Sequence, residues 1–126
     1  MITDEDKKKL AKDTDGLLTY EYIANHINNC LSDMDYLTDN MIRVDRTGQF
    51  VASAARYLTA IDTDLYRSQI NLLIAATIEK DREHRYLGDL LQGIWGTDYA
   101  DHAAELAARD DNFRRIHKRL FPTTVI

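Results

Sequence analysis

Proline and glycine are so scarce in this sequence that they leave room for few strands or tight turns. The only proline is Pro122, and five glycines are spread over 126 residues. Strands, and the turns between them, are usually marked by clusters of these two residues. We therefore expect helices to fill most of the chain.

Apolar residues recur at intervals of three and four along most of the chain, the spacing that collects them on one face of an α-helix. The charged segment 79–85 and Gly88 are points where a long helix can bend, and Asp110 and Asp111 can divide the last one in two. The periodicity predicts a short leading helix over 3–13 and further helices over 19–44, 47–61, 62–94 and 97–120.

These helices predict an all-α fold, an antiparallel helical bundle of about four main helices plus a short N-terminal helix. One core of this kind suits a chain of this length, so we expect residues 1–126 to form a single domain. The sequence shows no evident internal repeat.

The charge and the apolar stretches limit the classes of partner. A net charge of −5 opposes broad contact with nucleic acid or anionic lipid, so we do not expect nucleic acid as a partner. The apolar stretch 72–78 is far shorter than the ~20 residues of a membrane helix, and no charged-then-apolar leader opens the sequence. We expect a cytoplasmic protein, without membrane contact, whose single Cys30 fits a reducing compartment. A local basic face remains on the last predicted helix, at Arg114, Arg115, Lys118 and Arg119.

The motifs of common enzyme classes are missing from this sequence. No Glu has His three residues later, as a di-iron bundle requires, and there is neither a Gly-x-Ser-x-Gly elbow nor a Walker loop. Asp98, His102 and Glu105 have a spacing that permits a metal site, but such acids more often form a solvated helical face. We therefore predict no catalytic residues, no cofactor and no metal, and an enzyme is the less favoured class.

Arginine and tyrosine stand side by side at three places in the predicted third and fourth helices. Tyrosine can stack on a base and arginine can hold a phosphate, but both residues are also enriched in protein interfaces. A tryptophan at a helix end can plug the core or serve as an anchor for a partner. The candidate ligand- or partner-binding residues are Arg56, Tyr57, Tyr66, Arg67, Arg85, Tyr86 and Trp95.

The leading functional hypothesis is a non-enzymatic helical protein that acts through protein binding or self-assembly, as an adaptor, inhibitor or assembly component. Small residues on the third predicted helix allow close approach of another backbone, and the apolar tail 121–126 suits a contact with a neighbouring subunit. We therefore expect a protein partner and a homo-oligomer. The alternative is a protein that binds a nucleotide or another phosphate-containing ligand through the arginine and tyrosine residues.

Overall fold

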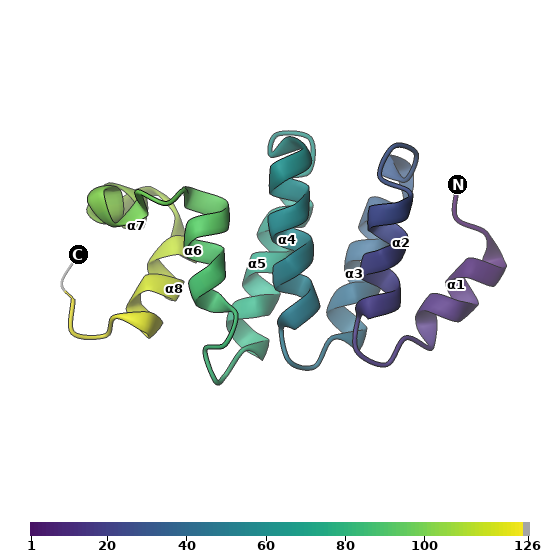
Figure 1. Ribbon diagram of the computed structural model, residues 1–126, viewed down its shortest axis with the longest axis horizontal. Helices are drawn as coiled ribbons and strands as arrows, with labels where there is room; N and C mark the ends of the chain where they lie inside the picture. Colours follow the sequence, from purple (N-terminus) through teal and green to yellow (C-terminus); the bar gives the residue numbers. More distant parts are fainter. Residues whose placement is uncertain (125–126) are drawn as a thin grey trace.

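The computed structural model describes residues 1–124, which form eight α-helices and two short 3-10 helices (Figure 1). The predicted all-α class is confirmed, whereas the specific bundle of about four main helices is not. The α-helices are α1 (Asp4–Ala11), α2 (Leu17–Asn25), α3 (Met34–Val44), α4 (Gln49–Asp62), α5 (Arg67–Lys80), α6 (Leu87–Trp95), α7 (Ala103–Arg109) and α8 (Asp111–Leu120), and the 3-10 helices are η1 (Leu31–Asp33) and η2 (Tyr99–His102).

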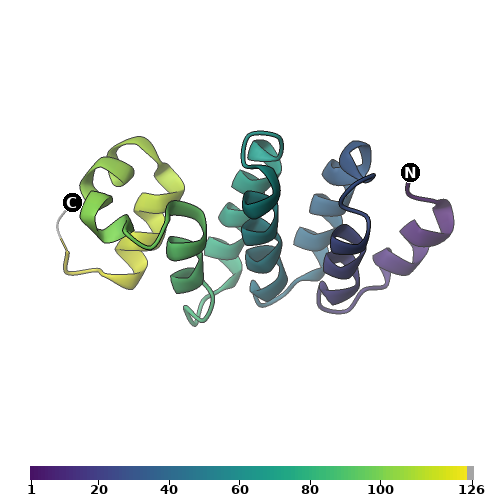
Figure 2. The same cartoon turned by 45° about the horizontal axis from the view of Figure 1, so that its top comes forward.

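The helices stand in two layers along the long axis of the molecule (Figures 1 and 2). The front layer consists of α2, α4 and α6, and the rear layer of α1, α3, α5 and α8. Each front helix packs against its front neighbours and against the rear helix that pairs with it, as α4 does against α2, α6 and α5. Front and rear helices run in opposite directions, so the chain forms a row of antiparallel helix pairs.

The predicted helix 19–44 is broken, and the predicted helix 62–94, whose continuity the sequence leaves open, is divided. The predicted helix 19–44 stops at Asn25, and a turn that contains η1 leads into α3. Asn28 and Asn29 occupy this turn, and asparagine side chains compete with helical hydrogen bonds. The predicted helix 62–94 is likewise divided into α5 and α6 by a turn that begins at Asp81.

A buried aspartate closes each turn that leads from a rear helix to the next front helix. In the turn between α3 and α4, Asp45 is 1% exposed. Its Oδ1 accepts from the N–H groups of Thr47 and Gly48, and its Oδ2 from those of Phe50 and Val51, each at 2.9 Å. One carboxylate thus satisfies donors both in the turn and at the start of α4, which carry no helical partner.

The same arrangement recurs at Asp13, before α2, and at Asp81, before α6. Asp13 accepts from Asp15, Gly16 and Thr19, and Asp81 from Arg85, Tyr86 and Leu87. Burial raises the pKa of Asp13, but its hydrogen bonds, first of all that from the Thr19 hydroxyl, outweigh burial and hold the pKa below its ordinary value.

The residue three positions after each aspartate has a positive φ: 107° at Gly16, 94° at Gly48 and 58° at His84. Glycine suits the left-handed conformation, and histidine adopts it less often. The prediction of no internal repeat was wrong, because the turn and the helix pair after it form a repeating unit. Its sequence signature is only Asp-x-x-Gly, at 13–16 and 45–48, with histidine in place of glycine at position 84.

The C-terminal end of the row is covered by α7 and closed by aromatic contacts. Asp110 caps α8 by accepting from the Phe113 N–H, and it also accepts from Trp95 Nε1 at 2.9 Å. The Trp95 ring meets the Phe113 ring edge-on at 5.2 Å. Trp95 therefore joins the end of α6 to α8.

His117 lies in this end of the core and is 6% exposed. Its ring packs between those of Phe113 and Phe121, with centroids 5.5 and 4.9 Å away, and its Nδ1 has no hydrogen-bond partner. Burial lowers the pKa of His117 because a charged imidazole loses its hydration there.

Replacing Asp45 with alanine should destabilise the protein strongly, because four backbone N–H groups lose a charged acceptor. Hydrogen bonds to charged groups contribute about 1.5–3 kcal/mol each. Water can replace some of these bonds in the variant, so we expect the free energy of unfolding to fall by about 3 kcal/mol or more. Urea unfolding followed by circular dichroism measures it. Asp39→Ala, at an exposed position of α3, is the matched control and should change stability by less than about 0.5 kcal/mol. Equal losses in the two variants would show that the turn does not depend on the carboxylate.

Acid should destabilise the C-terminal end through His117. Its pKa is lower in the folded chain than in the unfolded chain, where it is about 6.5, so the unfolded state binds the proton more readily. The stability is complete above about pH 6.5 and is lost as the pH falls toward the folded pKa. The melting temperature should therefore drop less in His117→Leu than in the wild type when the pH is lowered from about 7.5 to 5.5. His102→Gln, at an exposed histidine, should behave as the wild type, and an unchanged drop in His117→Leu would contradict the assignment.

Candidate functional site

The rear layer extends one helix further than the front layer at the N-terminal end of the row. Along the part of the chain that the structure describes, α1 lies beside α3, but no helix lies in front of α1 as α2 lies in front of α3 (Figure 1). The side of α2 that faces away from α4 is therefore uncovered. A groove remains between α1 and α2.

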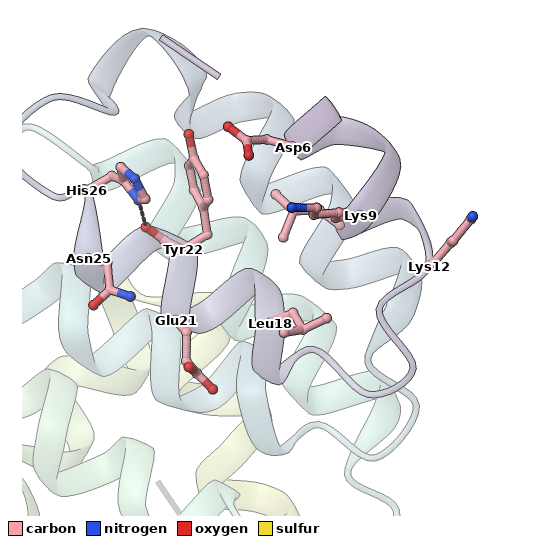
Figure 3. Close-up of a pocket in the computed structure, with 9 residues that line it drawn as sticks. Asp6, Lys9, Lys12, Leu18, Glu21, Tyr22, Asn25 and His26 are labelled. Carbon is pink, nitrogen blue, oxygen red and sulfur yellow. Dashed lines mark hydrogen bonds between the residues drawn. The ribbon is translucent and has the colours of Figure 1, made fainter. Parts of the chain in front are cut away.

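This groove has a volume of about 490 Å³. In Figure 3, Asp6 of α1 and Tyr22 of α2 point toward each other, whereas Lys12 projects outward. The groove is lined by Asp6, Lys9, Leu10 and Lys12 from α1 and the residue after it, and by Leu18, Glu21, Tyr22, Asn25 and His26 from α2 and its end.

Apolar and aromatic groups form the middle of the groove. Leu10 is buried, while Leu18 is 53% exposed although it is a large apolar residue. The rings of Tyr22 and His26 stack with centroids 4.0 Å apart. His26 Nδ1 donates to the Tyr22 carbonyl at 2.8 Å, because a carbonyl oxygen only accepts.

Charged residues of both signs form the rim of the groove. Lys9 and Lys12 lie on the α1 side, Glu21 lies on α2, and Asp6 lies near the Tyr22 hydroxyl (Figure 3). Burial and the negative charge of Asp6 raise the pKa of Tyr22, so its hydroxyl stays protonated and can donate. The rim can therefore pair with acidic and basic groups at different places.

The segment before α1 is tied to η1, and the end of α1 is tied to α3, which keeps the two walls of the groove in place. Near the start of α1, the Ile2 N–H donates to Asp33 Oδ2 at 2.9 Å. At its end, buried Asn40 Nδ2 donates to the Leu10 carbonyl at 2.9 Å and to Thr19 Oγ1 at 3.0 Å. One amide thus joins α1, α2 and α3, and the groove is preformed.

The seven residues predicted from the sequence lie at several separate places. Arg56 is exposed on α4 and pairs with Asp89 of α6 at 3.5 Å. Tyr57, the next residue, meets the Tyr20 ring edge-on at 6.1 Å, between α4 and α2. Tyr66 is 2% exposed and belongs to the core, so its ring is not available to a partner on the surface.

Four of the predicted residues lie, two at a time, in two cavities elsewhere. Arg67 and Trp95 line a cavity of about 210 Å³ between α5 and the end of α6, where Arg67 is paired with Asp64 and Trp95 with Asp110. Arg85 and Tyr86 line a hollow of about 260 Å³ in the turn before α6. The structure therefore brings together two of these residues at a time and not all seven.

The groove between α1 and α2 was missed by the sequence reasoning. The predicted apolar stripe runs through Tyr20, Ile23 and Ile27, and Leu18 and Tyr22 lie beside it. A helix with apolar residues on a second side is the signal that could have revealed it.

The spacing of Asp98, His102 and Glu105 does not produce a metal site. His102 Nε2 lies 3.4 Å from Asp98 Oδ2. Within residues 1–124, however, no three His, Cys, Asp or Glu side chains are grouped so that they could hold a metal ion. The pair forms an exposed contact one helical turn apart.

The chain has no match among models of protein families, curated proteins or solved structures. No helix among residues 1–124 combines the length and the apolar character that crossing a membrane requires. Function must therefore be inferred from the surface of the molecule itself, beginning with the groove between α1 and α2.

Proposed function

We propose that this protein is a non-enzymatic binding protein whose α1–α2 groove receives an amphipathic helix of a partner protein. The observation that carries the proposal is the groove with exposed Leu18 in its lining, in front of which no helix of residues 1–124 lies. A helix laid in the groove would pair with α1 as α2 pairs with α3, and would lie beside α2 as α2 lies beside α4. The fold thus supplies the template for its own binding site.

The lining of the groove indicates the chemistry of the partner helix. An apolar stripe with residues at intervals of three and four would cover Leu18 and Tyr22. Acidic residues on one flank would meet Lys9 and Lys12. Basic residues on the other flank would meet Glu21. Such a helix differs from a membrane-binding one, which carries mostly basic residues on its polar face.

A photo-reactive amino acid in place of Leu18 tests the proposal in the cells that make the protein. The matched control carries it in place of Leu72, which is 51% exposed on α5. We expect position 18 to cross-link one polypeptide and position 72 not to. The cross-linked segment, identified by mass spectrometry, should have apolar residues at helical spacing.

Three results would overturn this assignment. Equal cross-linking at positions 18 and 72 would show non-specific contact, and a cross-linked segment without helical periodicity would exclude the proposed partner class. A covalent dimer of the chain itself would make the groove a contact for self-assembly, which native mass spectrometry of the wild type would then confirm.

Leu18→Asp should weaken binding of the identified segment by tenfold or more. Burying a leucine contributes roughly 1.5–3 kcal/mol, and about 1.4 kcal/mol corresponds to tenfold in affinity. Leu72→Asp is the control and should leave the affinity unchanged. Isothermal titration calorimetry with the synthetic segment measures both, and circular dichroism checks that both variants fold.

A further inference from the structure

The edge of the molecule where the rear helices end collects positive charge. All four rear helices carry basic residues in their last turn, among them Arg43 of α3 and Lys80 of α5. Such residues complement the helix dipole. Two front helices that begin at this edge, α2 and α4, have no acidic residue in their first turn to offset them.

Two neighbouring turns bring four of the edge cations around one hollow of about 260 Å³. Arg46 comes from the turn before α4, and Lys80, Arg82 and Arg85 come from the end of α5 and the turn before α6. The two turns abut closely, since a Cβ added at Gly48 would lie 3.1 Å from Asp81 Cβ. Asp45 and Asp81, the buried aspartates of these turns, hold the backbone of both through hydrogen bonds.

The acidic residues in this hollow are already engaged. The Asp81 carboxylate is buried and accepts from three backbone N–H groups. Glu83 pairs with Arg85. Among the described residues, no ion pair includes Arg46, Lys80 or Arg82. The four cations of the hollow therefore exceed its two carboxylates, Asp81 and Glu83, by two formal charges.

We propose that this hollow binds the phosphate group of a phosphorylated molecule. Arginine offers paired N–H donors that match phosphate oxygens, and lysine adds a point charge. The half-buried Tyr86 ring on the wall offers a face to the organic part of the ligand. The same phosphate chemistry is available on a free metabolite or on a phosphorylated side chain.

A second hollow extends the site along the edge. Arg46 also lines a hollow of about 460 Å³, together with Lys12 and Arg43. A ligand with more than one phosphate can therefore reach from one hollow into the next, so binding should strengthen with the number of phosphates.

Titration of the full chain, followed by amide NMR shifts, tests the site. The probes are inorganic phosphate, pyrophosphate, adenosine diphosphate and a phosphoserine peptide with its unphosphorylated form, all at one ionic strength. We expect saturable shifts at residues 46–48 and 80–87, and tighter binding of pyrophosphate than of phosphate. Preference for adenosine diphosphate over the phosphopeptide assigns the site to small molecules, and the reverse preference assigns it to phosphorylated proteins.

The double variant Arg46→Gln/Arg82→Gln should lose at least tenfold in pyrophosphate affinity. The matched control, Arg67→Gln/Arg114→Gln, removes the same charge at two exposed arginines elsewhere. Equal losses in the two double variants, shifts that do not saturate, or equal binding of the unphosphorylated peptide would overturn the proposal. Leu18→Asp should leave phosphate binding intact, so this test is independent of the groove.

Discussion

Each turn that joins one helix pair to the next depends on a carboxylate that is removed from water and surrounded by backbone N–H groups. At Asp45 this arrangement fixes the path of the chain from the end of α3 to the start of α4. Because the turn recurs at Asp13 and Asp81, the chain reverses in the same way each time. The rear helices consequently all run in one direction, and the pairs line up in a row and not around a common axis.

The direction shared by the rear helices has an electrostatic effect that a closed antiparallel bundle does not have. In such a bundle, residues that complement helix dipoles alternate between the two ends. Here the basic last turns of α1, α3, α5 and α8 meet at one edge. A chain with a net charge of −5 thereby presents a cationic edge. The net charge alone therefore does not predict which charged groups this edge can bind.

The helical class could be predicted because it depends on local features, the scarcity of proline and glycine and the spacing of apolar residues. The break after Asn25 could not, since apolar residues keep helical spacing through that turn, as Ile27, Cys30 and Met34 show. The division of the last predicted helix at Asp110 could, because an aspartate there can cap a new helix. The third repeat was hidden because His84 replaces the glycine of the other two turns. The groove and the basic hollow depend on contacts between distant turns and helices, which no local pattern contains.

In a row of helix pairs, unfolding is not coupled equally between all parts of the molecule. Each pair touches only its neighbours, so its stability depends on its own contacts and on two interfaces. The buried His117 lies at one end and the groove at the other, with α4 and α5 between them. Protonation can therefore loosen the C-terminal end without opening the α1–α2 groove. A change at one end therefore reaches the other only through the helix pairs that lie between them.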